Sequence, residues 1–353
     1  MKKNLLLLLS VVLITFLLSE IFVRIFFPQS LQRYWVVNEE EYGLIVNKKN
    51  FYYKLHRLKN IKASYLFGDY RNRITLKDEN LKYLPKVLIL GDSFTFGWLL
   101  EDKLTYVHKL QLDNMNYEFI NPSVGAWGSS AYTMYTELYC KKIKPEKIIV
   151  FLNTDDVYRG YHNRYYKLVD GKLIKNRISY NNTSKLSKFD KNIPFYLFLK
   201  KNSHSFVLIR NIVYNFLKSS PKLNEKIIYY YPHPHFKVEK EKILKINLLN
   251  KKIFKELKKI TKSCGAELLI IYTGWANLDE MSENNPNKFF LQNAKNFFYS
   301  NSILYYDLSY NMIDLYNNPK KYLIDVDLHP NEKGANLIYL SARKFINNFL
   351  ETK

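Results

Sequence analysis

The stretch Val87-Leu88-Ile89-Leu90-Gly91-Asp92-Ser93 decides the fold, because an apolar run meets a glycine and then two polar residues. A short apolar run that ends in a turn is typical of a strand buried on both faces of a sheet. Glycine permits a tight exit, so Ser93 is expected near the N-terminus of the next helix. There its hydroxyl is exposed and its backbone N–H points to a developing oxyanion. The alternative is that Asp92 or Ser93 only caps that helix.

Four further apolar runs repeat this pattern, at 117–120, 148–152, 268–272 and 303–306. Helical patterns lie between several of them. Apolar residues at three- and four-residue spacing run from Ile246 to Cys264, with Gly265 as a C-cap, and a last helix is predicted over 331–349. Strands that alternate with helices predict an α/β fold with a doubly wound parallel sheet of about five strands.

Two segments depart from the pattern. Residues 158–240 begin with strand-like runs on either side of Asp170-Gly171, which predicts a hairpin, and continue with a basic, aromatic, helical stretch from Pro194 to Lys218. We interpret them as an insertion that caps the functional edge of a domain spanning 85–353. Residues 29–84 are aromatic and charged without a clean period, and are expected to form a juxtamembrane stalk and packing segment.

The N-terminal residues 1–28 predict a cytoplasmic tip and a membrane anchor. Lysines 2 and 3 precede apolar runs at 5–18 and 21–27, which end at Pro28 and together approach the length of one membrane crossing. Glu20 and Arg24 lie four residues apart and are expected to pair on a helix. No small-residue cleavage site follows the apolar run, which favours an anchor over a cleaved signal peptide. The positive-inside rule then places the remaining chain on the extracytoplasmic side of the inner membrane.

The composition sets broad limits. With 353 residues, 47% of them hydrophobic, the chain can bury a large core. Its net charge of +22 is compatible with nucleic acid, anionic lipid or an acidic polymer, but the lysines are scattered, which favours compositional bias. The extracytoplasmic placement argues against nucleic acid as a partner. Cys140 and Cys264 lack the spacing of a zinc site, and we expect two separate thiols, with a disulfide as the alternative.

Polar residues follow the predicted strands where a ligand binds in an open α/β sheet. Gly125 follows the second strand and is a candidate backbone donor, and Asn153 follows the third and is a candidate side-chain donor. Just before the last helix, Asp327 precedes His329 by two residues, so its carboxylate can orient an imidazole that deprotonates Ser93. Together they supply a nucleophile, a base, an orienting acid and oxyanion donors.

On these residues the chain resembles the SGNH (GDSL-type) hydrolases, over roughly residues 85–350 apart from the insertion. Gly91-Asp92-Ser93 matches the first block of that family, Gly125 the second, and the run Asp327, His329, Pro330, Asn331 and Gly334 the last. The resemblance implies a three-layer α/β/α flavodoxin-like fold and an acyl-serine mechanism. With its anchor, the chain is similar to bacterial envelope members related to polysaccharide O-acetyltransferases and acetylesterases.

The chain departs from the family in two places. The third block is usually Gly-x-Asn-Asp, whereas here Asn153-Thr154-Asp155-Asp156 stands. We prefer Asn153 as the donor, since Asp155 can donate only when it is protonated. The acid usually lies three residues before the histidine, which is Val326 here. Asp327 matches a variant seen in acyltransferase-like relatives, and Asp325 is the alternative acid.

The resulting hypothesis is an extracytoplasmic serine esterase or O-acyltransferase that acts on acyl groups, above all acetyl, of an envelope glycan. This chemistry needs no metal or organic cofactor. Alternatives are a lipase or thioesterase on acyl chains near the membrane, and a non-catalytic glycan-binding or assembly subunit. His233 and His235 lack a third metal ligand, and Trp127, Tyr161 and Trp275 either pack in the core or line a cleft.

Overall fold

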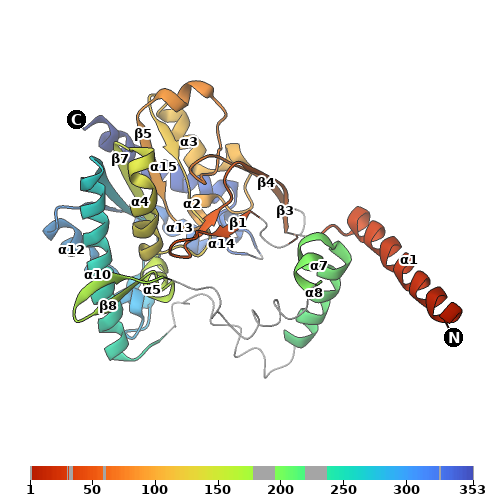
Figure 1. The fold of residues 1–353 in the computed structure, drawn as a ribbon. Helices are drawn as coiled ribbons and strands as arrows, with labels where there is room; N and C mark the ends of the chain where they lie inside the picture. The colour runs from red at the N-terminus through yellow and green to blue at the C-terminus, as the bar shows by residue number, and fades with distance from the viewer. Residues whose placement is uncertain are drawn as a thin grey trace. The chain divides into compact units, whose positions relative to one another are not determined.

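The computed structural model describes residues 2–29, 31, 35–58, 61–177, 195–218, 237–325 and 327–352 (Figure 1). The chain divides into two compact units. One comprises Met1–Tyr34, Leu55–Lys62 and Tyr180–Tyr230, and the other comprises Trp35–Lys54, Ala63–Ser179 and Tyr231–Lys353. All the candidate site residues belong to the second unit, which we call the catalytic unit only because it carries these candidates. His233 and His235 lie outside the described residues.

A five-stranded parallel sheet forms the centre of the catalytic unit, and its strands are the five predicted ones. They are β5 (Lys86–Leu90), β6 (Glu118–Ile120), β7 (Lys147–Leu152), β10 (Glu267–Tyr272) and β11 (Leu304–Asp307). Their spatial order is β11-β10-β7-β5-β6. Counted along the chain, this is the order 2-1-3-4-5 of a flavodoxin-like sheet, whose switch point lies between its first and third strands. These strands are β5 and β7, so Ser93 and Asn153 both follow strands at that point.

Helices cover both faces of this sheet, which gives the three-layer α/β/α fold. On one face lie α4 (Ser129–Ile143), α10 (Lys240–Ser263), α11 (Pro286–Leu291) and α12 (Ala294–Ser300), and on the other α3 (Tyr106–Asp113) and α15 (Glu332–Glu351). The short helices are α2 (Ser93–Phe96), α5 (Asp156–His162), α13 (Ile313–Asn317) and α14 (Pro319–Tyr322), with 3-10 turns at Glu79–Tyr83, Asp102–Leu104, Leu278–Glu280 and Tyr310–Met312.

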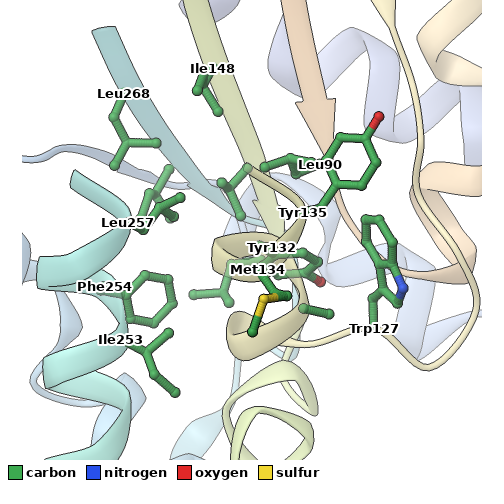
Figure 2. Close-up of a cluster of buried hydrophobic side chains, with 14 of the residues drawn as sticks. Leu90, Trp127, Tyr132, Met134, Tyr135, Ile148, Ile253, Phe254, Leu257 and Leu268 are labelled. Carbon is green, nitrogen blue, oxygen red and sulfur yellow. The ribbon is translucent and has the colours of Figure 1, made fainter. Parts of the chain in front are cut away.

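The core explains why these strands read as continuous apolar runs. Along β5, Leu88 and Leu90 point into the layer of α4 and α10, whereas Val87 and Ile89 point into the layer of α3 and α15. Side chains of a strand alternate between its faces, so a strand covered on both sides needs apolar residues at every position. Figure 2 shows the first of these layers, where Phe254 of α10 lies among residues of α4 and the strands.

The sequence predicts the end of α10 and the start of α15, whereas α10 begins at Lys240, before the apolar stripe that starts at Ile246. Helix α10 is followed by Gly265 at a φ of 76°, a left-handed conformation that glycine adopts without strain. Helix α15 is capped by Asn331, whose side chain accepts hydrogen bonds from the backbone N–H groups of Lys333 and Gly334. A Cβ on Gly334 would lie 2.2 Å from the carbonyl oxygen of Tyr322, so a larger residue does not fit there.

Part of the predicted stalk packs into the catalytic unit. The segment carries two antiparallel strands, β1 (Val36–Asn38) and β2 (Ile45–Asn47), and a second pair, β3 (Phe51–Leu58) and β4 (Ile61–Phe67). Leu44 and Val46 are buried in the α4 layer, and Trp35 and Tyr65 form a separate aromatic cluster with Phe96. Several aromatic residues of this segment therefore serve as core, whereas Tyr52 and Tyr83 are exposed.

The predicted insertion begins with the expected hairpin. Strands β8 (Tyr166–Val169) and β9 (Lys172–Lys175) are antiparallel, and Asp170 and Gly171 have φ angles of 49° and 70°. Two consecutive positive φ angles are the signature of a type I′ turn, which matches the twist of a hairpin. The helical stretch that follows forms α7 (Tyr196–Asn202) and α8 (His204–Lys218) in the other unit.

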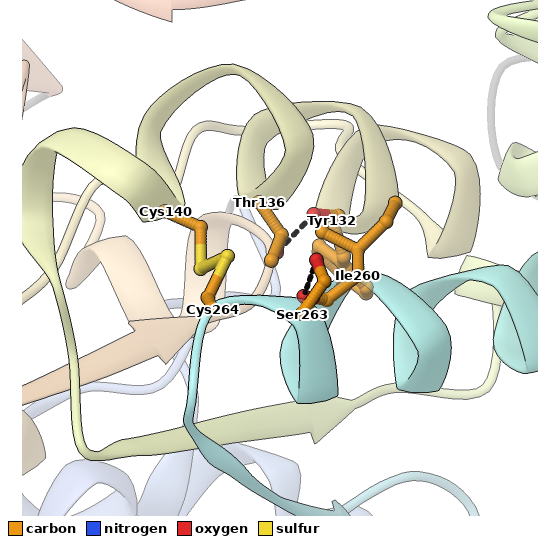
Figure 3. Close-up of a disulfide and its surroundings, with 6 residues drawn as sticks. All are labelled: Tyr132, Thr136, Cys140, Ile260, Ser263 and Cys264. Atoms are coloured by element: carbon orange, nitrogen blue, oxygen red, sulfur yellow. Dashed lines mark hydrogen bonds between the residues drawn. A yellow bond between two sulfur atoms is a disulfide. The ribbon is translucent and has the colours of Figure 1, made fainter.

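The expectation of two separate thiols is wrong. Cys140, near the end of α4, and Cys264, at the C-cap of α10, form a disulfide (Figure 3). The two residues are 124 positions apart and their Cα atoms lie 6.2 Å from one another. Spacing in sequence did not indicate the pairing, because it arises where two long helices pack side by side and end together.

The N-terminal apolar segment forms one continuous helix, α1 (Lys2–Phe26). Its residues Leu6–Phe26 are long and apolar enough to cross a membrane, with a mean hydropathy of 2.7. A signal sequence satisfies the same criteria. The expected pair is present, because Arg24 Nε donates to Glu20 Oε1 at 2.9 Å.

Candidate active site

Ser93 is positioned by a tight turn between β5 and α2. A Cβ on Gly91 would lie 1.8 Å from Thr95 Oγ1, so only glycine fits at the strand exit. Asp92 then caps α2, because its side chain accepts a hydrogen bond from the backbone N–H of Phe94 at 2.8 Å. Ser93 is therefore the first residue of the helix, where backbone N–H groups have no acceptor within the helix.

A loop before α15 brings His329 to this serine. His329 Nε2 lies 2.8 Å from Ser93 Oγ, and Nδ1 lies 2.9 Å from Asp327 Oδ2. Leu328 between them has a φ of 54° and a side chain that is 63% exposed. A left-handed leucine is strained, and this turn allows the flanking aspartate and histidine to meet while the leucine points outward. The three polar side chains thus form one hydrogen-bonded chain across 236 residues of sequence.

The structure separates the two candidate acids. Asp327 is half-buried and contacts the histidine, whereas Asp325 is exposed. With Nδ1–H donating to the carboxylate, His329 presents an unprotonated Nε2 that can accept the proton of Ser93. This is the arrangement that general-base activation of a serine requires.

Sequence reasoning missed Trp98, which also contacts Asp327. Trp98 Nε1 donates to the same oxygen, Oδ2, at 2.5 Å, and its ring centroid lies 5.5 Å from that of His329. The ring of Phe94 lies 5.6 Å from His329. Trp98 follows the first block by only a few residues, but its partner is 229 positions away, so no local pattern pointed to the contact.

A buried ionic cluster is joined to the serine turn through Asp92, which caps α2. We define the cluster as Asp92, Arg159 and Asp156. Arg159 Nη1 donates to Asp92 Oδ2 at 2.8 Å and to Asp156 Oδ1 at 3.2 Å. Tyr132 donates to Asp156 Oδ2 at 2.7 Å, which satisfies an acceptor in the core. Charges removed from water need such partners, because an unpaired buried charge costs several kcal/mol. Arg159 was another residue without a sequence signal.

Asp155 lies at the edge of this cluster and faces the same pocket as Ser93. Its Oδ2 lies 3.7 Å from Arg159 Nη2. Burial, helped by the nearby charge of Asp92, raises the pKa of Asp155 to about 6 against the opposing effect of Arg159. The third block thus contains two acids with different surroundings. Asp156 is buried in the ionic cluster, and Asp155 lines the pocket.

A cavity of about 270 Å³ opens beside Ser93. Its walls combine the polar residues of the strand ends with aromatic and aliphatic side chains. The lining residues are Asp92, Ser93, Phe94, Asn153, Thr154, Asp155, Arg159, Trp275, Met281, Tyr316, Asp327, Leu328 and His329. The cavity is thus large enough for a small ligand, and most of its accessible surface is apolar.

The two candidate oxyanion donors have different positions. Asn153 lines the cavity, and its Oδ1 accepts a hydrogen bond from the backbone N–H of Thr154 at 2.7 Å. Because a backbone N–H must meet an oxygen, the amide nitrogen of Asn153 is the atom left to donate elsewhere. Gly125 is not among the lining residues. The close backbone approach in its block occurs at Gly128, where a Cβ would lie 2.6 Å from the carbonyl oxygen of Asp156.

The three aromatic residues that could either pack in the core or line a cleft have different positions in the structure. Trp127 is 1% exposed and donates from Nε1 to the carbonyl oxygen of Ile45, so it belongs to the core. Tyr161 packs against the same core, partly buried. Trp275 lines the cavity with the ring of Tyr316 beside it at 4.9 Å between centroids. Trp275 and Tyr316 therefore form the aromatic wall of the candidate site.

Solved structures similar to this chain include several esterases. The psychrotrophic esterase EstA from Pseudoalteromonas sp. matches 76% of this chain and 99% of its own, with 14% identity and a TM-score of 0.44. The acetyl xylan esterase AlAXEase matches 74% and 99%, with 13% identity and a TM-score of 0.40. A protein named TesA matches 74% and 98%, with 9% identity and a TM-score of 0.43.

No protein-family profile and no curated protein sequence matches the chain. At identities and TM-scores this low, the similar structures do not define an activity. The chemistry proposed for this chain therefore depends on its own site geometry.

Proposed function

We propose that this protein is a serine esterase or O-acyltransferase of the SGNH type, with Ser93 as nucleophile, His329 as general base and Asp327 as the acid that orients the histidine. One observation carries the proposal: Ser93 Oγ, His329 and Asp327 Oδ2 are joined by hydrogen bonds of 2.8 and 2.9 Å at the edge of a cavity. A helix cap or a surface loop requires no such alignment.

The reaction follows from this arrangement. His329 Nε2 takes the proton of Ser93 as Oγ forms a bond to the acyl carbonyl carbon. The N–H of Ser93 and the amide of Asn153 donate to the oxyanion. The tetrahedral intermediate then expels the alcohol, which leaves with the proton from His329, and an acyl-serine remains. Water or a second alcohol, deprotonated by His329, resolves the acyl-serine and restores the free hydroxyl.

A short acyl group fits the cavity. Its volume of about 270 Å³ lies below the range of roughly 300–1,000 Å³ found for pockets that take drug-sized ligands. The aromatic wall of Trp275 and Tyr316 lines the same cavity as the serine. We therefore propose acetyl as the acyl group and an envelope glycan as its carrier or acceptor.

Two features support the proposal that the protein acts outside the cytoplasm. The Cys140–Cys264 disulfide is of a kind that persists in oxidising compartments and is rare in the cytosol. Helix α1 is long enough to anchor the chain, and the lysines before its apolar span favour a cytoplasmic N-terminus. We propose that the catalytic unit faces the extracytoplasmic side of the inner membrane.

Labelling of the full-length protein with a fluorophosphonate tests the nucleophile. We expect modification at Ser93, and loss of both labelling and acyl-ester cleavage in Ser93→Ala, on the order of 10⁶-fold in kcat. Ser123→Ala is the matched control, because Ser123 is equally buried and its hydroxyl has no hydrogen-bond partner in the described structure. Well-folded protein that is never labelled at Ser93 would support the alternative of a non-catalytic subunit.

Substrate series then define the reaction. Chromogenic esters of increasing chain length should show a maximum at two carbons, whereas a preference for long chains would indicate a lipase or thioesterase. Acetylated glycan with and without a free glycan acceptor separates hydrolysis from transfer. With the acceptor present, transfer predicts that acetylated acceptor accumulates and that less acetate is released. The rate at which the ester is consumed should stay unchanged.

A further inference from the structure

The polar pair of helix α1 is held by the turn between α7 and α8. Glu20 accepts hydrogen bonds from Ser203 Oγ at 2.7 Å and from the backbone N–H groups of His204 and Ser205 at 2.9 and 3.0 Å. Arg24 donates to the carbonyl oxygen of Asn202 at 2.7 Å. All of these residues belong to one compact unit (Figure 1). The start of α8 is thus fixed beside the last turns of the apolar helix.

This attachment determines how deep the start of α8 lies relative to the end of the apolar span of α1. Glu20 precedes Phe26, the last residue of the span, by six residues, which is about 9 Å along a helix. Amphipathic helices that lie in a membrane interface sit about 5–10 Å into the boundary between headgroups and acyl chains. A charged pair at this depth needs polar partners, since few are available from the lipid. The turn between α7 and α8 supplies them.

Helix α8 also carries an apolar face that no described part of the chain covers. Ile209, Ile212 and Val213 are 60%, 59% and 50% exposed and lie at the spacing i, i+3, i+4, which is one side of a helix. Arg210 next to this face is exposed as well. An apolar face bordered by a cation is typical of helices that bind anionic lipid surfaces.

We propose that α8 lies in the interface of the membrane that α1 crosses, with Ile209, Ile212 and Val213 among the acyl chains. This inference depends on the proposed anchoring by α1. The bilayer is the favoured occupant over a second copy of the chain, because the start of α8 is hydrogen-bonded to the last turns of α1 within one compact unit. The end of α1 exposes apolar residues as well, such as Ile25 and Phe26, which are 65% and 62% exposed. The segment after the hairpin is then attached to the membrane at a second point.

Spin labelling in proteoliposomes with anionic lipid tests the inference. The native cysteines are paired, so single cysteines introduced from Leu208 to Val213 can be labelled without reduction. We expect the ratio of oxygen to nickel-complex collisions to oscillate with a helical period, with maxima at positions 209, 212 and 213 and minima at 210 and 211. A label at Tyr83, 88% exposed in the catalytic unit, gives the aqueous reference.

Three outcomes would contradict the proposal in different ways. Labels at 209 and 212 that match the Tyr83 reference would place the face in water. Low collision rates with both reagents would show a protein contact instead of lipid. A label at Val12 in α1 reports on anchoring: a lipid-like Val12 with an aqueous Ile212 refutes only the interfacial helix, whereas an aqueous Val12 refutes the anchor itself.

Discussion

Trp98 and His329 donate to the same carboxylate oxygen, Oδ2 of Asp327, over 2.5 and 2.9 Å. A hydrogen bond to a charged group contributes about 1.5–3 kcal/mol, so the indole fixes the carboxylate that fixes the imidazole. In a triad the acid holds the histidine in the required tautomer and orientation. In the proposed triad Trp98 is therefore a positioning residue, although it does not line the cavity.

The substitution Trp98→Phe should keep the ring and remove the donor. We expect kcat/KM to fall about 10-fold or more. The carboxylate of Asp327, relieved of one donor, stabilises the protonated imidazole more strongly, so the acid limb of the pH profile should move to higher pH. Trp127→Phe removes another indole donor, buried in the core, and should lower stability without moving that limb. An unmoved limb in Trp98→Phe would show a structural role only.

The two aspartates of the last block provide a matched pair. Asp327→Asn should reduce kcat about 10⁴-fold, because an amide stabilises the wrong tautomer of His329 and no longer balances the imidazolium. Asp325→Asn makes the same carboxylate-to-amide change at an exposed residue, and its kcat should equal that of the wild type within error. The measurement is hydrolysis of a short chromogenic ester by the full-length protein. A large loss in Asp325→Asn with activity kept in Asp327→Asn would reverse the assignment.

Asp155 should make the catalytic unit less stable as the pH rises. Its pKa is about 6 in the folded protein and 3.8 as the ordinary value, so the folded state binds more protons between these values. Stability therefore falls as the pH increases from about 4 to 6, and the cost remains above 6. Asp155→Asn should be more stable than the wild type at pH 8, by on the order of 2–3 kcal/mol, and similar at pH 4.

Chemical denaturation at both pH values measures this difference. The exposed hairpin residue Asp170 supplies the control, since Asp170→Asn suits the same left-handed turn and should show no comparable dependence on pH. A stability difference for Asp155→Asn that is the same at pH 4 and pH 8 would contradict the assigned cause.

Loss of the disulfide should destabilise the fold. In the chain-entropy picture, a cross-link that closes a loop of more than 100 residues contributes up to about 5 kcal/mol. Cys140→Ala/Cys264→Ala, or the reduced wild type, should unfold at a lower temperature. Reductant should have no effect on the double variant. Cysteines in the oxidised protein that react freely with a thiol reagent would show that the bond does not form.

The sheet could be predicted because its information is local. Each of the five strands is an apolar run that ends at a glycine or a polar residue, and burial on both faces requires such a run. The turn residues Asp170-Gly171 and the cap Asn331 are equally local, since backbone geometry alone selects them. The insertion was harder, because its helices belong to a different unit from its hairpin.

By itself, the sequence determined which residues follow a strand or precede the last helix and could carry chemistry: Ser93 and Asn153 after strands, and Asp327 and His329 before the helix. Only the tertiary structure decided which of them meet. It put Asp327 in contact with His329, left Gly125 out of the cavity lining and paired Cys140 with Cys264. It also brought Trp98 against Asp327 and Arg159 against Asp92. The reason is physical. A strand or a turn depends on neighbours in the chain, whereas a hydrogen bond across more than 200 residues exists only after the layers have packed.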